Sequence, residues 1–203
     1  MKILIVGDVC GRPGRAAFAK YTPELKKKYA VDVVIVNGEN SAGGKGITRK
    51  SLEALYHGGA DIITTGNHVW DKKEVLDIID AEPFLIRPAN YPEGTPGKGW
   101  CVYPFKAKNI AVINLSGRAF MPPMDCPFQK VEDILHELRD ERARLVRLAR
   151  QRRREHEAGV FAAAQLRDGV GEHRLRVGDL RAHVVGQEGS KARVREQIVL
   201  QVV

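Results

Sequence analysis

Three apolar segments near the N-terminus each end in a short polar run that could bind metal or transfer a proton. The runs are Gly7-Asp8, Asn37-Gly38-Glu39-Asn40 and Gly66-Asn67-His68. Carboxylate and carboxamide oxygens, together with an imidazole, form a donor set that suits divalent cations. Two such cations about 3.5–4 Å apart are the standard device for phosphoester hydrolysis. We therefore expect a metal and catalytic site made from Asp8, Glu39, Asn40, Asn67 and His68.

These polar runs follow segments with the pattern of strands in a parallel sheet. The apolar runs occupy residues 2–6, 31–36 and 61–65. Segments with helical spacing lie between them at 16–29 and 51–57, and Thr48 is suited to cap the second. Such alternation is typical of βαβ units, whose ligands bind at the carboxyl ends of the strands. Neighbouring parallel strands lie about 4.8 Å apart, so the three polar runs should converge.

The pattern becomes more varied in the middle of the chain, where a Pro- and Gly-rich loop follows residue 89. The expected elements are a helix at 72–80, strands at 83–88, 100–105 and 110–115, and a helix at 127–138. A tight turn at 106–109 should join the last two strands. We therefore predict an α/β fold in which a parallel start leads into a more mixed sheet.

Each candidate residue also has a structural interpretation. Asp8 alone could cap a helix, Glu39 and Asn40 could form a turn, and a single histidine such as His68 is more often structural than catalytic. The glycines of "GDVCGRPG" could suggest a nucleotide-binding loop, but their spacing is not that of GxGxxG. The coincidence of metal-binding residue types at three successive strand ends favours a site.

Five motifs resemble the YmdB-like branch of the calcineurin-like metallophosphoesterases, over residues 1 to about 138. They are "GDVCGRPGR", "VIVNGENSAGGKGIT", "TTGNHVWDKKE", "IRPANYPEGTPGKGW" and "INLSGRAFMPPMDCPF". Cys10 stands where the wider superfamily has its second ligand. The resemblance implies a four-layered α/β/β/α sandwich, incomplete at the C-terminus of this chain.

The resemblance also implies roles for the candidate residues and a class of substrate. Asp8 would bind one of two divalent metal ions (Fe, Mn or Mg), Glu39 would bridge them, and Asn40 and Asn67 would bind the second. His68 would be the general acid, with Asp71 or Lys72 as candidates to orient it. Members of the family hydrolyse phosphodiesters, notably 2′,3′-cyclic nucleotides, and a metal-activated hydroxide is the natural nucleophile.

Composition changes near residue 139. Residues 1–138 hold 18 Lys and Arg against 16 Asp and Glu, whereas residues 139–203 hold 15 Lys and Arg against 9 Asp and Glu. Almost all the basic residues of this second part are Arg. We therefore divide the chain into a metallophosphoesterase core at 1–138 and an atypical Arg-rich tail at 139–203, a helix followed by strand fragments. A shifted reading frame or a genuine replacement could produce such a tail, and its composition favours the first.

The family's metal site also uses three histidines from motifs like D-F-H-A-E and G-T-H-T-H, and neither motif occurs here. The histidines of the second half are His136, His156, His173 and His183. We therefore expect weak metal binding and low hydrolysis, unless His173 or His183 reaches the site. The alternative is a non-catalytic protein that binds phosphate, nucleotide or RNA through the half-site and the basic tail. The Arg-rich stretch 142–154 could equally be a solvated helix face.

Composition excludes several other classes. No apolar run approaches about 18 residues, so no membrane partner is expected, and the apolar start of the chain is too short for a signal peptide. Three scattered cysteines suit a reducing cytoplasm better than a disulfide framework. The oligomeric state is left open, and a homo-oligomer is compatible with the sequence.

Overall fold

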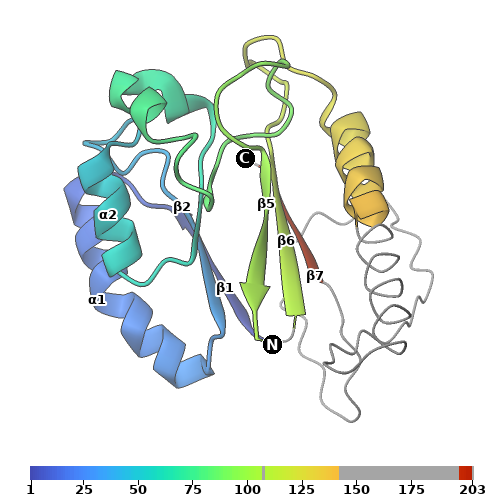
Figure 1. The fold of residues 1–203 in the computed structure, drawn as a ribbon. Helices are drawn as coiled ribbons and strands as arrows, with labels where there is room; N and C mark the ends of the chain where they lie inside the picture. The colour runs from blue at the N-terminus through green and yellow to red at the C-terminus, as the bar shows by residue number, and fades with distance from the viewer. Residues whose placement is uncertain (107, 142–196, 203) are drawn as a thin grey trace, which may run out of the picture.

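The computed structural model describes residues 1–106, 108–141 and 197–202. Figure 1 shows four layers: α1 (Gly11–Tyr29) and α2 (Arg49–His57) on one outer side, two sheets in the middle, and a yellow-to-orange helix over 127–141 on the other outer side. The predicted α/β/β/α sandwich is therefore confirmed.

The first sheet is entirely parallel and has the strand order β1-β2-β3-β4. Its strands are β1 (Ile3–Asp8), β2 (Val33–Asn37), β3 (Ile62–Thr64) and β4 (Leu85–Ile86). Asp8 is aligned with Asn37, and Asn37 with Thr64. The carboxyl ends of three strands are therefore flush, and the polar runs that follow them leave the sheet at the same edge.

The second sheet has the order β5-β6-β7 and is mixed. β5 (Trp100–Phe105) pairs antiparallel with β6 (Lys108–Leu115), and β6 pairs parallel with β7 (Gln197–Val202). The hairpin turn is shorter than predicted, because β6 begins at Lys108. The other sequence features predicted beyond residue 141, including the Arg-rich stretch 142–154, lie outside the described residues.

Alternation along the central strands explains the layers. Val34 and Val36 of β2 pack with buried residues of α1 and α2, whereas Val33 and Ile35 face the second sheet. Each fully buried aliphatic side chain contributes about 1.5–3 kcal/mol. On the far side of the second sheet, β6 packs against the helix over 127–141 through residues spaced as one helical face. The residues of that helix face are Val131, Ile134, Leu135 and Leu138.

Local sequence chemistry sets several element ends. Thr48 caps α2 as predicted, because its side chain accepts a hydrogen bond from the Ser51 N–H and the Ser51 hydroxyl oxygen accepts one from the Thr48 N–H. β1 continues through Asp8, beyond the predicted end at residue 6. β4 is shorter than predicted, because Pro83 and Pro88 lack the N–H groups that a longer strand needs.

The helix predicted over 72–80 is wrong. That segment contains only a short 3₁₀ helix, η2 (Lys73–Asp77). Another, η1 (Asn67–Asp71), precedes it, and Lys72 is extended between them at φ −118° and ψ 112°. Val69 and Val75 are both fully buried. The turn before Lys72 buries Val69 and the turn after it buries Val75. This tertiary packing overrides the local helical pattern. In the described part of the chain, no helix has the length and apolarity needed to cross a membrane.

Candidate functional site

The five candidate residues lie at one edge of the first sheet. Asp8 is the last residue of β1, Glu39 and Asn40 form the turn after β2, and Asn67 and His68 begin η1 just after β3. Because these strands are parallel and in register, the polar runs predicted to converge come from adjacent strand ends.

Asn40 connects the first two strand ends. Its Nδ2 donates to Asp8 Oδ2 over 2.8 Å, and its backbone oxygen accepts from the N–H groups of Gly11 (2.9 Å) and Gly44 (3.2 Å). The side-chain Oδ1 of Asn40 is buried and has no hydrogen-bond donor among the described residues. A buried oxygen without a donor is costly, so a cation at this point would satisfy it.

Glu39 connects the second strand end to the third. The carboxylate is 5% exposed; Oε2 accepts from the His68 N–H over 3.2 Å, and Oε1 accepts from Asn37 Nδ2 over 3.3 Å. Asn37 Oδ1 in turn accepts from the Glu39 N–H over 3.0 Å. A Cβ on Gly66 would lie only 2.4 Å from Glu39 Oε2, so glycine is needed there to let the carboxylate approach.

His68 is oriented by an acid on its own 3₁₀ turn. Its Nδ1 lies 2.9 Å from Asp71 Oδ2. An Nδ1–H that donates to this carboxylate leaves Nε2 as the ring atom available to a substrate. Of the two candidates to orient the ring, the structure brings Asp71 into contact, whereas the side chain of Lys72 lies beside Gly46.

A buried aromatic contact behind η1 was not visible in the sequence. Tyr91 is 9% exposed and packs edge-on against Trp70 of η1, with ring centroids 5.9 Å apart. Burial raises the pKa of Tyr91, and the charge of Glu39 adds to the rise. This contact braces the segment that carries Asn67 and His68, and only the long-range fold brings its two rings together.

The loop that presents Tyr91 is held by a buried arginine. Arg87 donates to the backbone oxygens of Pro96 (2.9 Å), Pro88 (2.8 Å) and Thr95 (2.9 Å), and burial lowers its pKa. The sequence predicted only a Pro- and Gly-rich loop here. The guanidinium replaces the missing secondary structure by satisfying carbonyls along the loop.

The donor set is only partly gathered. Within residues 1–106 and 108–141, no three His, Cys, Asp or Glu side chains come close enough to hold a metal ion by themselves. The side chain of Asn67 makes no hydrogen bond with another described residue and is partly exposed, so it is available to a ligand. His136 is exposed on the helix over 127–141, and the three later histidines lie outside the described residues. The chemistry of the donors fits a divalent cation, with Asn40 Oδ1 as the buried oxygen that most needs one.

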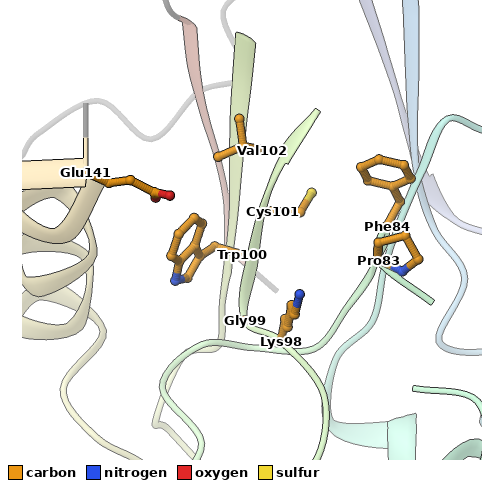
Figure 2. A pocket seen from close by; sticks show the side chains of 8 residues that line it. All are labelled: Pro83, Phe84, Lys98, Gly99, Trp100, Cys101, Val102 and Glu141. Atoms are coloured by element: carbon orange, nitrogen blue, oxygen red, sulfur yellow. The ribbon is translucent and has the colours of Figure 1, made fainter. Parts of the chain in front are cut away.

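A separate hollow of about 530 Å³ lies beside β5 and contains none of the candidate residues. Figure 2 shows Trp100 and Val102 on the side of β5 that faces Glu141, and Cys101 on the side of Phe84. The hollow offers no gathered acids and no imidazole, and burial raises the pKa of Cys101 to about 12. We therefore assign the chemistry to the strand ends and not to this hollow.

The thiols should differ in reactivity in the folded chain. Iodoacetamide at a pH of about 8 is expected to alkylate Cys126 before Cys101, because the thiolate is the reacting form. The N–H groups of Gln129 and Phe128 hold the pKa of Cys126 below its usual value, whereas Cys101 stays protonated until the pH approaches about 12. Peptide mass spectrometry measures the order. Equal rates in the folded chain would contradict it, and unfolding in urea should equalise them.

Comparisons with known proteins show the family and the fold of the chain. The family model described as "YmdB-like protein" matches residues 4–173. The chain is 54% identical over 137 residues to the 2′,3′-cyclic-nucleotide 2′-phosphodiesterase of Bacillus subtilis, which is 68% of this chain and 52% of that protein.

Two solved structures share the fold. A hypothetical protein of Thermus thermophilus has a TM-score of 0.64 at 41% identity, and a phosphatase of Mycoplasma pneumoniae has a TM-score of 0.64 at 33% identity. Each match covers 68% of this chain, with 53% of the first structure and 51% of the second. The chain thus spans about half the length of the relatives it matches. Since the family model matches well over half of the chain, the chain belongs to the YmdB-like protein family.

Proposed function

We propose that this chain is a metal-dependent phosphoesterase that hydrolyses phosphodiesters such as 2′,3′-cyclic nucleotides. The observation that carries the proposal is the arrangement of Asp8, Glu39, Asn40 and the His68–Asp71 pair at adjacent ends of parallel strands. The name of the Bacillus subtilis relative supports the substrate class. The unpaired state of all three cysteines is consistent with a cytoplasmic enzyme.

The chain's own residues would hold two divalent cations, of which Fe, Mn and Mg are the candidates. In the proposal Asp8 and Glu39 would hold them with their carboxylates, Glu39 being shared between the two, and Asn40 and Asn67 would offer carboxamide oxygens to the second. Carboxamides bind a cation without adding negative charge, which limits repulsion of an anionic substrate. When bound, such cations lower the pKa of water and stabilise charge on a phosphoryl group.

His68 would supply the proton for the leaving group. Asp71 holds Nδ1 over 2.9 Å, which fixes the tautomer and leaves Nε2 to donate to the departing alkoxide. The same carboxylate stabilises the imidazolium that precedes this transfer, as in other acid–histidine pairs. His68 is also fixed through its backbone, because its N–H donates to Glu39 Oε2.

A binding protein without turnover is the second candidate. It is favoured by the lack of a three-ligand cluster of His, Cys, Asp or Glu among residues 1–106 and 108–141. Neutral imidazoles normally complete the metal shell and offset the carboxylates. With carboxylates and carboxamides alone, the site would bind cation and phosphate weakly, and turnover would be slow.

Hydrolysis with and without cation tests the proposal. Bis-p-nitrophenyl phosphate and 2′,3′-cAMP should be hydrolysed in Mn²⁺ and not after chelation. His68→Ala should lower the rate about 100-fold, because the proton donor is lost. His57→Ala, an exposed histidine at the end of α2, is the matched control and should keep the rate. If the chain binds the nucleotide in Mn²⁺ but does not hydrolyse it, the enzyme hypothesis is rejected in favour of a binding protein.

A further inference from the structure

The glycine-rich loop at 41–46 adjoins the candidate site. Asn40, whose side chain contacts Asp8, accepts through its backbone oxygen from the N–H of Gly44 in this loop and from the N–H of Gly11 at the start of α1. A Cβ on Gly11 would lie 3.6 Å from Gly44 N, so the loop and the start of α1 are in contact. Arg15 of α1 also donates to the backbone oxygen of Ser41.

Three exposed cations surround this loop: Arg12, Lys45 and Lys72, which we call the basic rim. Arg12 follows Gly11 in the chain, and Lys45 stands between Gly44 and Gly46. Lys72 packs on the loop from the other side, since a Cβ on Gly46 would come within 2.7 Å of Lys72 Cγ. Gly46 has a φ of +74° and no side chain, and both properties allow this approach.

The basic rim has no acidic partner in the described part of the chain, where none of its members forms an ion pair within 4.0 Å. The neighbouring acids are otherwise engaged: Asp71 holds His68, and Glu74 accepts from the backbone N–H of Arg49. Like charges on and next to one loop, without acids to neutralise them, attract an anion.

We propose that the basic rim binds a second phosphate of the substrate, so that the preferred substrate is an RNA 3′ end carrying a cyclic phosphate and not a free cyclic mononucleotide. The inference rests on the proposed function, in which the reacting phosphate occupies the strand ends at Asp8 and Glu39. An RNA 3′ end with a 2′,3′-cyclic phosphate carries a second, backbone phosphate one nucleotide away, which a free cyclic mononucleotide lacks and which the exposed cations of the rim could contact. The rim contains lysine and arginine without an aromatic, so it would contact backbone phosphate and not stack on bases.

Ligand binding by the full chain tests the inference without turnover. Calorimetry in Mn²⁺ would compare adenosine 3′-phosphate with the dinucleotide ApAp, whose internal phosphate lies one nucleotide away from the terminal one. The dinucleotide is expected to bind about tenfold more tightly, the gain of two or three exposed ion pairs. Its affinity should also fall more steeply with salt, by a slope of about 0.7 for each phosphate contact.

Substitutions locate the gain. The double variant Lys45→Gln, Lys72→Gln should bind both ligands with the affinity of the mononucleotide, whereas Lys28→Gln at the far end of α1 should retain the tenfold difference. The proposal that the basic rim binds a second phosphate would be overturned if the unaltered chain bound both ligands with equal affinity. It would also be overturned if the double variant kept the tighter binding of the dinucleotide.

Two further results separate the alternatives. Adenosine 3′,5′-bisphosphate carries its second phosphate on the 5′ oxygen, the position of the internal phosphate of ApAp, and should bind at least as tightly as ApAp. Binding no tighter than that of adenosine 3′-phosphate would mean that the gain comes from the added nucleoside, and would overturn the phosphate contact. If the dinucleotide binds more tightly but the chain hydrolyses neither 2′,3′-cAMP nor a dinucleotide ending in a 2′,3′-cyclic phosphate, the phosphate contact of the rim is supported and the catalytic proposal is rejected. Hydrolysis of either substrate without the gain in binding would support catalysis and reject the rim.

Discussion

Replacing Gly66 with alanine is expected to abolish divalent-cation binding and hydrolysis of 2′,3′-cAMP. The new Cβ would lie 2.4 Å from Glu39 Oε2 and 2.7 Å from its Oε1, closer than any real contact. Glu39 cannot withdraw without cost, because it is 5% exposed and accepts hydrogen bonds from Asn37 and His68. The carboxylate proposed to bridge the cations would be displaced, and overpacking of this kind costs about 1–3 kcal/mol of stability.

The matched control is Gly7→Ala in β1. Gly7 lies at the same edge of the sheet, but a Cβ there would meet no atom within 4 Å, so metal binding should be unchanged. Calorimetry with Mn²⁺ measures the binding, and thermal unfolding measures the stability of both variants. A Gly66→Ala chain that is folded and binds Mn²⁺ as tightly as the unaltered chain would rule out Glu39 as a ligand.

The sequence predicted correctly that the three strand ends meet at one edge of the sheet, because the signals for this are local. Apolar runs that end in polar residues mark the ends of buried parallel strands, and the register of β1, β2 and β3 places those ends together. The capping of α2 by Thr48 was equally local. The space that Gly66 leaves for Glu39 was not predictable, because it depends on two turns that meet only in the folded chain.

The failures have the opposite cause. The segment 72–80 carries a helical pattern, yet burial of Val69 and Val75 on both sides of an extended Lys72 produces two 3₁₀ turns. The loop after β4 showed only Pro and Gly, although Arg87 and Asn90 organise it through hydrogen bonds to carbonyls. Polar residues that stabilise a loop from inside have no periodicity, so residue type alone does not distinguish them from solvated ones.

Asn90→Ala is expected to lower the free energy of unfolding by about 3 kcal/mol, because three hydrogen bonds of a buried amide are lost. Asn90 is fully buried; its Nδ2 donates to the backbone oxygens of Ser116 (2.9 Å) and Asp125 (3.1 Å), and its Oδ1 accepts from the Ser116 N–H (2.8 Å). Alanine would leave the buried Ser116 N–H and backbone oxygen, and the partly buried oxygen of Asp125, without these partners.

The Asn90 side chain joins the loop after β4 to the segment that leaves β6, so its loss should loosen the contact between the two sheets. Urea unfolding measures the difference, with Asn109→Ala as the control, because Asn109 is exposed near the start of β6 and should change stability by less than about 0.5 kcal/mol. Equal midpoints for the two variants would mean that water or a rearranged backbone replaces all three hydrogen bonds. In that case the hydrogen bonds of Asn90 would not be needed to hold the second sheet against the strand ends of the first.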